Sequence, residues 1–362
     1  MSYAVDKLAS HPVALKQLRE TGTAPLISVH LMPQNLCNQR CSFCSYRLPD
    51  NKNSSHFNEG VHIPWPDMVR LLADFAEMGV QGIEVTGGGE PLAYPPTRAL
   101  WEQLASLPFA TALVTNGTLL KDRAELVTQK MKWARVSIDA SNAKTYAEMR
   151  KCPAGHFVKA WEAVAQLRKH APADPDFRLG VGFVLCNENV AEVYDFVRMV
   201  KESGADNVRL SVTFSDQNED FFEDKEAVRR AIGASIAAKQ DFEDETFKVH
   251  NMMPTRGWEI QHPAQDYKRC PTKDVLCVVE GECKVYTCCT FTGSVHGLYG
   301  KFTEHPDGFR GLWDSFREWR RDFRADQYCQ CACLYRDRNL AMNELIDGEE
   351  TPAVEHLHKE FV

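Results

Sequence analysis

The sequence lacks any segment suited to secretion or to crossing a membrane. Its first 20 residues are amphipathic and charged, without the apolar stretch of a signal peptide, and no run in the chain approaches 18 apolar residues. We therefore expect a cytoplasmic protein with no membrane partner.

Positive charge is also scarce. The chain has 42 lysine and arginine residues against 50 aspartate and glutamate residues, which gives a formal net charge of −8. This sign disfavours nucleic acid as a partner but does not exclude a local basic pocket. The sequence contains no low-complexity tract, and it has no His-x-x-x-His pair for a hydrolytic zinc site.

Cysteine, in contrast, is abundant and clustered. Thiols in the cytoplasm stay reduced, so clustered cysteines indicate metal or cluster ligation rather than disulfides. One group is Cys37, Cys41 and Cys44. The other group lies near the C-terminus and consists of Cys270, Cys277, Cys283, Cys288, Cys289, Cys329, Cys331 and Cys333. Cys152 and Cys186 stand apart, and we interpret them as buried structural residues.

Strand and helix patterns alternate between residues 27 and 240. The expected strands are 27–33, 82–89, 110–117, 134–140, 178–186 and 207–214. The expected helices are 66–79, 97–107, 120–131, 157–170, 190–204 and 225–240. Six such units predict an α/β fold, a partial (β/α)6 TIM-like barrel, with an open doubly wound sheet as the alternative. In a barrel the active site would lie at the carboxyl ends of the strands.

The chain is long enough for this barrel and a smaller domain. We predict an N-terminal helical extension at 1–24, the barrel at 25–245, a cysteine-rich domain at 246–345 and a C-terminal tail at 346–362. Within the cysteine-rich domain, 275–289 predicts a β-hairpin that turns at 280–282, and 311–324 predicts an amphipathic helix.

Unusual residues follow the expected strands. The triplet Cys37, Cys41 and Cys44 follows the first strand, "TGGGEP" ends the second, "TNG" the third and "SIDAS" the fourth. We expect them to meet at one face of the barrel. A zinc site would require a fourth ligand, whereas three thiolates can hold an iron–sulfur cluster with one iron left open.

The motif C-x3-C-x2-C with Phe43 before its last cysteine resembles that of radical S-adenosylmethionine (radical SAM) enzymes. "GGGEP" at 87–91, "VSIDAS" at 136–141 and "KTYAEMRK" at 144–151 are similar to further segments of this family, so the resemblance spans roughly residues 27–215. It implies that Cys37, Cys41 and Cys44 hold a catalytic [4Fe–4S] cluster whose open iron binds S-adenosylmethionine. Reductive cleavage of the bound molecule would give a 5′-deoxyadenosyl radical that removes hydrogen from the substrate.

The resemblance also implies which residues bind S-adenosylmethionine. They are Phe43, Gly88, Gly89, Glu90, Asn116, Ser137 and Arg150. Phe43 would contact adenine, and the segment 88–90 would face the ammonium group, because glycine permits close approach of the backbone and a carboxylate suits a cation. Ser137 and Arg150 are candidates for ribose and carboxylate contacts. Asn116 is a candidate for the ribose or part of a plain turn, and a solvated position is the alternative for Arg150.

The second cysteine group resembles the auxiliary-cluster domains of the SPASM group, in the short "twitch" form. This implies one auxiliary [4Fe–4S] cluster bound by Cys270, Cys288 and two of Cys329, Cys331 and Cys333, with Cys333 favoured. Cys289 is an alternative to Cys288. Cys277 and Cys283 are either spare or the mark of a second auxiliary cluster, and a zinc ribbon is the other interpretation.

These features predict an enzyme that oxidises, crosslinks or rearranges a small polar metabolite or a peptide. It would take electrons from a reductant such as flavodoxin or ferredoxin. The alternatives are a maturase specific for the peptide precursor of a natural product and a non-enzymatic iron–sulfur electron-transfer protein. The short stretch before the first strand indicates no leader-binding module, which disfavours a peptide. Arg256, Trp258 and His262 are expected to contact the substrate or to pack between the domains.

Overall fold

The computed structural model describes residues 4–48, 56–213, 222–255, 265–329, 333–349 and 354–362. Cys331, Arg256, Trp258 and His262 lie outside these ranges. The described residues form a sheet of ten strands in the order β10-β9-β8-β1-β2-β3-β4-β5-β6-β7. None of the helices in these ranges combines the length and the apolar character that a membrane crossing needs.

Parallel strands make up most of this sheet. They are β1 (Ser28–Leu31), β2 (Gly82–Val85), β3 (Ala110–Thr115), β4 (Met131–Ser137), β5 (Arg178–Leu185), β6 (Asn207–Val212) and β7 (Lys248–Asn251). The six expected strands are thus confirmed with shifted ends. The sequence pattern did not predict β7, because three of its four residues are polar.

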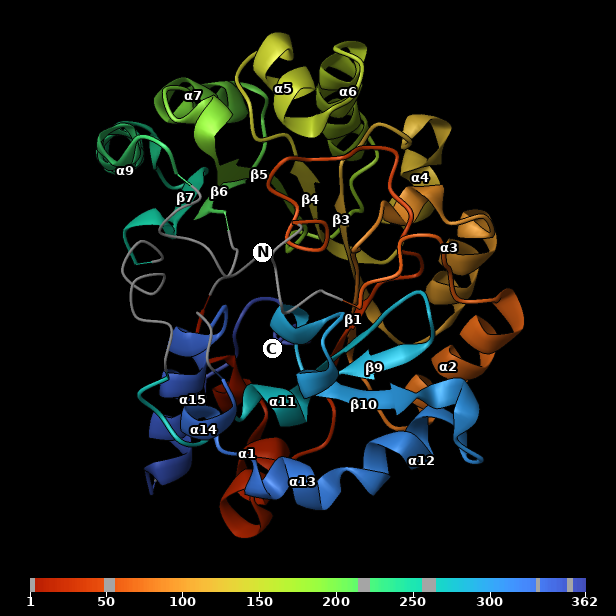
Figure 1. The fold of residues 1–362 in the computed structure, drawn as a ribbon. Helices are drawn as coiled ribbons and strands as arrows, with labels where there is room; N and C mark the ends of the chain where they lie inside the picture. The colour runs from red at the N-terminus through yellow and green to blue at the C-terminus, as the bar shows by residue number, and fades with distance from the viewer. Residues whose placement is uncertain (1–3, 49–55, 214–221, 256–264, 330–332, 350–353) are drawn as a thin grey trace.

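Helices cover the outer face of the parallel strands in an arc (Figure 1). They are α2 (Trp65–Glu77), α3 (Thr97–Ser106), α4 (Ala124–Thr128), α5 (Ala143–Arg150), α6 (Gly155–Lys169), α7 (Val193–Glu202) and α9 (Lys225–Phe242). The main apolar core lies between these helices and the sheet, where Phe183 of β5 packs on Phe196 of α7 with ring centroids 4.8 Å apart. The fold is therefore an α/β partial TIM-like barrel, as predicted.

Helix α4 is shorter than expected. The sequence pattern predicted a helix over 120–131, but residues Lys121–Arg123 form a 3-10 turn and β4 already begins at Met131. Further 3-10 turns are η1 (Lys7–Ser10), η3 (Pro91–Ala93), η5 (Asn187–Asn189), η6 (Cys289–Phe291), η7 (Val295–Gly297) and η8 (Phe302–Glu304).

The cysteine-rich region continues the barrel sheet. Strands β8 (Leu276–Val279) and β9 (Lys284–Tyr286) form the expected hairpin, and β10 (Leu298–Lys301) pairs with β9. β8 also lies parallel to β1, with Val29 opposite Cys277. The hairpin is thereby joined to the first barrel strand, beside the loop that carries the cysteine triplet.

The remaining helices lie around this hairpin (Figure 1). They are α1 (Pro12–Thr21), α11 (Thr272–Val275), α12 (Gly308–Ser315), α13 (Arg317–Asp322), α14 (Ala325–Tyr328) and α15 (Arg336–Asp347). The single helix expected at 311–324 is thus two helices, α12 and α13, with a break at Phe316.

Candidate active site

A cavity of about 310 Å³ lies at the carboxyl ends of the parallel strands. All ten residues predicted to hold the first cluster and S-adenosylmethionine line it: Cys37, Cys41, Phe43, Cys44, Gly88, Gly89, Glu90, Asn116, Ser137 and Arg150. They come from loops that follow four different strands and from the end of α5. Their expected convergence is therefore present, while their individual roles stay predictions.

The cysteine loop is anchored to the end of α5. The amides of Arg40 and Ser42 donate to the carbonyls of Arg150 and Met149 at 3.0 and 2.7 Å. Burial raises the pKa of the Cys37 thiol, and it raises that of Cys41 to about 12 against the opposing charge of Arg150. A metal or cluster bound by these two thiols would have to displace their protons.

Arg47 joins the cysteine loop to the glycine segment. Its guanidinium donates to the carbonyls of Asn35 and Gly88 at 3.0 and 3.2 Å, and it lies 3.5 Å from the Cys44 sulfur. An ion pair of 2.8 Å with Glu59 completes its contacts. Sequence analysis missed Arg47, although its position three residues after the last cysteine of the motif could have drawn attention to it.

The glycine segment passes directly against the cysteine loop. A Cβ atom on Gly89 would overlap the carbonyl oxygen of Leu36, and one on Gly88 would overlap the ring of Phe57. Gly89 thus requires glycine, because the atoms that it meets are backbone, whereas at Gly88 the neighbour is the far end of the Phe57 side chain, which can shift. The neighbours that impose this are parts of the chain itself.

Glu90 connects the end of β2 to the end of β3. Its buried carboxylate accepts hydrogen bonds from the Thr115 hydroxyl at 2.5 Å, the Asn116 amide at 2.8 Å and the Leu92 amide at 3.1 Å. Burial raises the pKa of Glu90, and these hydrogen bonds act in the opposite direction. The side chain has a structural role in addition to the predicted contact with an ammonium group.

Asn116 belongs to a turn and also faces the cluster loop. Its side-chain amide donates to the Asn38 side chain at 2.8 Å and lies 4.0 Å from the Cys37 sulfur. Gly117, which follows it, has a φ of 77° and permits the turn. The segment is therefore a turn, and the contact of Asn116 with the ribose stays a prediction.

Arg150 is buried rather than solvated, so the solvated alternative was wrong. The guanidinium is paired with Asp139 and donates to the side chain of Gln39 at 2.6 Å and to the Ile138 carbonyl at 3.2 Å. It also lies 5.9 Å from the ring centroid of Phe43. Asp139 and Gln39 line the same cavity and were missed, although Asp139 stands within the quoted "SIDAS" segment.

A second, smaller cavity of about 30 Å³ lies in the cysteine-rich region. Its lining includes Cys270, Cys288, Cys329 and Cys333. Cys289 lines a different cavity instead, with its sulfur 3.3 Å from the Tyr335 hydroxyl. The cysteines at 277 and 283 are buried in the apolar core. Four of the five cysteines predicted for the auxiliary cluster therefore share this cavity, and the fifth, Cys331, lies outside the described residues.

Hydrogen bonds surround the Cys333 sulfur. The Tyr267 hydroxyl lies 3.1 Å from it and the Tyr335 amide 3.3 Å. The Asn339 side chain donates to Tyr267 at 3.0 Å and accepts from the amide and hydroxyl of Thr272 at 3.1 and 2.8 Å. Asn339 thus links α11 and α15 to the residues that flank this thiol.

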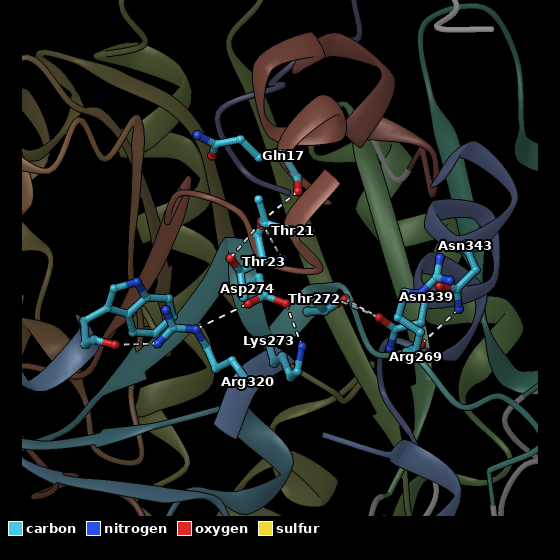
Figure 2. Close-up of polar contacts among 11 residues, drawn as sticks. Gln17, Thr21, Thr23, Arg269, Thr272, Lys273, Asp274, Arg320, Asn339 and Asn343 are labelled. Carbon is cyan, nitrogen blue, oxygen red and sulfur yellow. Dashed lines mark hydrogen bonds and ion pairs between the residues drawn. The ribbon is translucent and has the colours of Figure 1, made fainter. Parts of the chain in front are cut away.

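A buried charge network supports the same region (Figure 2). Asp274 lies between the ammonium of Lys273 at 2.6 Å and the guanidinium of Arg320 at 3.3 Å. Arg320 also donates to the Trp313 carbonyl at 2.6 Å. The network fixes α11 against α12 and α13 and so holds Cys270, which precedes α11, in place.

The donor sets do not resemble a site for one metal ion. Within the described ranges, no three histidine, cysteine, aspartate or glutamate side chains are grouped closely enough to hold such an ion. Three thiols line one cavity and four line another, which are the donor numbers predicted for the two clusters, and the zinc ribbon stays the alternative for the second set.

Comparison with known proteins finds the same family that the cysteine motif resembles. Residues 31–200 match the family model described as the Radical SAM superfamily. A GTP 3′,8-cyclase of Acidothermus cellulolyticus is 30% identical over 135 residues, which are 36% of this chain and 37% of that protein. An S-adenosylmethionine-dependent nucleotide dehydratase of Flammeovirga pacifica is 33% identical over 122 residues, which are 33% of this chain and 40% of that protein. The chain thus spans about two fifths of these relatives.

Solved structures share the fold at low sequence identity. Streptococcus suis SuiB bound to S-adenosylmethionine matches with a TM-score of 0.61 and 14% identity, over 91% of this chain and 78% of SuiB. The enzyme anSMEcpe with bound AdoMet also matches with a TM-score of 0.61 and 14% identity, over 89% of this chain and 96% of anSMEcpe. The cysteine motif, the glycine segment and the barrel agree with these matches: residues 31–200 of this chain are similar to the Radical SAM superfamily, and the solved structures share its fold.

Proposed function

We propose that this chain is a radical SAM enzyme that holds a [4Fe–4S] cluster through Cys37, Cys41 and Cys44 and acts on a small polar metabolite or a peptide. The observation that supports the proposal is the single cavity at the strand ends, which gathers these thiols, the glycine segment and Arg150. When bound there, the cluster and S-adenosylmethionine supply the 5′-deoxyadenosyl radical that removes hydrogen from the substrate.

The chain's own residues orient these groups. Arg47 and the α5 carbonyls hold the cysteine loop at the mouth of the cavity. Gly88 and Gly89 leave room for close approach, and Glu90 places its carboxylate where an ammonium group would be stabilised.

We further propose an auxiliary [4Fe–4S] cluster bound by Cys270, Cys288, Cys329 and Cys333. Their shared cavity and the hydrogen bonds at the Cys333 sulfur support this assignment. Hydrogen bonds to ligand sulfurs and exclusion of solvent both tune the reduction potential of such a cluster. Electrons would come from a cytoplasmic reductant such as flavodoxin or ferredoxin.

Both clusters can be tested by anaerobic reconstitution with iron and sulfide. We expect about eight irons per chain and, after addition of dithionite and S-adenosylmethionine, formation of 5′-deoxyadenosine. The variant Cys41→Ala should keep about four irons and form no 5′-deoxyadenosine. The variant Cys270→Ala should lose the auxiliary cluster alone. Iron content and chromatography of the products measure these outcomes.

Cys152→Ala is the matched control, since Cys152 is half-buried and lines neither cavity. It should retain both the iron content and the product. Absence of 5′-deoxyadenosine from the reconstituted natural chain would contradict the proposed function. A content of about four irons would remove only the auxiliary cluster.

A further inference from the structure

The interior of the barrel beneath the strand-end cavity is charged. In a packed barrel, inward-facing side chains form layers of mostly branched apolar residues. Here Arg135 of β4 lies one inward step below Ser137, and Arg209 of β6 is level with Ser137, because both are in register with Gly182 of β5. On β1 and β2, His30 and Glu84 are paired in register and line the same space. Arginine and glutamate are almost never fully buried unless they are paired.

These side chains line a cavity of about 260 Å³, which we call the arginine cavity. Its polar lining consists chiefly of Ser28, His30, Glu84, Arg135, Arg209 and Arg338. Arg338 comes from α15, and Phe361 packs edge-on against Trp133 at 5.7 Å beside the lining. The arginine cavity and the strand-end cavity share Tyr46, Thr86, Arg209 and Leu334. A ligand bound by the arginines would therefore extend toward the predicted site of S-adenosylmethionine.

Positive charge predominates in the arginine cavity. Three arginines face one acidic side chain, Glu84, which lies 3.3 Å from the imidazole of His30. Burial lowers the pKa of Arg338 and of His30. Arginine nevertheless stays protonated, so the three guanidinium groups keep positive charge in the cavity. The local charge is opposite in sign to the net charge of −8 for the whole chain.

Ser28 provides an independent indication of a ligand. Its side chain is 2% exposed and lines the arginine cavity. Its hydroxyl has no hydrogen-bond partner among the described residues. A buried hydroxyl without a partner is unfavourable, and a ligand oxygen in the cavity would satisfy it.

We propose that the arginine cavity binds the anionic group of the substrate, a phosphate or a carboxylate. Guanidinium groups present paired N–H donors that match both anions. The anion would lie among Arg135, Arg209 and Arg338, and the rest of the substrate would reach upward to the strand ends. The inference deepens the proposed function, but anion binding itself does not require the clusters.

The test uses thermal unfolding of the full chain, without clusters, in inorganic phosphate or acetate at constant ionic strength. A bound ion raises the unfolding midpoint as its concentration rises. We expect Arg135→Gln and Arg338→Gln each to weaken the apparent affinity about tenfold or more. Arg135→Lys keeps the charge but loses the paired donors, so its affinity for the ion should lie between that of the natural chain and that of Arg135→Gln. A stronger response to phosphate identifies a phosphate group on the substrate, and a stronger response to acetate identifies a carboxylate.

Arg98→Gln is the matched control, because it removes the same charge from a side chain that is 81% exposed on α3. It should bind the ion as the natural chain does. The inference is overturned if neither ion stabilises the natural chain, or if the control loses as much affinity as the cavity variants. Two cavity variants are used so that one failure to fold leaves the test intact. Formation of 5′-deoxyadenosine is measured separately. A natural chain that forms 5′-deoxyadenosine but binds neither ion contradicts only the anion site, and one that binds an ion but forms no 5′-deoxyadenosine contradicts only the proposed function.

Discussion

Arg150 ends α5 with its side chain only 3% exposed, and its guanidinium contacts two parts of the site. It pairs with Asp139 after β4 and donates to Gln39 in the cysteine loop. A buried ion pair adds little net stability when both partners are present, but removal of one partner leaves an uncompensated charge. The guanidinium of Arg150, which borders the predicted cofactor site, therefore also holds the cysteine loop in place.

We expect Arg150→Met to lower the free energy of unfolding by about 3–5 kcal/mol, because Asp139 would remain buried without its partner. Urea unfolding measures the change. The double variant Arg150→Met/Asp139→Asn should recover part of the loss, since the remaining carboxamide carries no charge. Arg98→Met, at an exposed position, should change the stability by less than about 0.5 kcal/mol. A single variant as stable as the natural chain would show that Asp139 finds another partner.

At the scale of elements, the crossing of the glycine segment and the cysteine loop places the cofactor residues in one cavity. Backbone meets backbone at Gly89, where neither segment can move aside as a flexible side chain would. This contact fixes the loop after β2 relative to the loop after β1. The hydrogen bonds of Glu90 then fix the loop after β3 in turn.

Gly89→Ala should therefore separate the two loops. We expect a loss of stability of about 1–3 kcal/mol from overpacking, together with weaker iron binding by the cysteine triplet. Gly155→Ala is the control, because an added Cβ there meets nothing within 4 Å and the residue begins α6. Unfolding in urea and iron content after reconstitution report the two effects. Full iron content in Gly89→Ala would contradict the tight crossing.

The sequence predicted some of these elements and missed others, for physical reasons. Buried parallel strands leave continuous apolar runs, so β1 to β6 and the residues at their ends were found. β7 has only one apolar residue among its four, and its position in the sheet depends on pairing with β6. Arg135 and Arg209 were missed because the strand pattern does not reveal which side of a strand faces the barrel interior. Charged residues within otherwise apolar strands were the available signal.

At the scale of the whole molecule, the barrel and the cysteine-rich region share one sheet and one apolar core. β8 pairs with β1, and Phe309 of α12 packs on Phe75 of α2 with ring centroids 4.8 Å apart. The side chain of Asn35 donates to Glu280 in the hairpin turn at 2.6 Å. The boundary predicted near residue 245 thus divides two regions that are joined by strand pairing and by a common apolar core.

A fragment limited to residues 25–245, the predicted barrel, should therefore fail to fold on its own. Removing β8 would leave the hydrogen-bonding groups of β1 at an open sheet edge, and removing α12 would expose the apolar face of α2. We expect the fragment to aggregate or to bind a hydrophobic dye strongly, while the full chain elutes as a discrete species and unfolds in one cooperative transition. Size-exclusion chromatography and dye fluorescence, run on both proteins under the same conditions, measure this difference. A discrete, cooperatively unfolding fragment would show that β1 is stable without β8 and that the two regions fold independently.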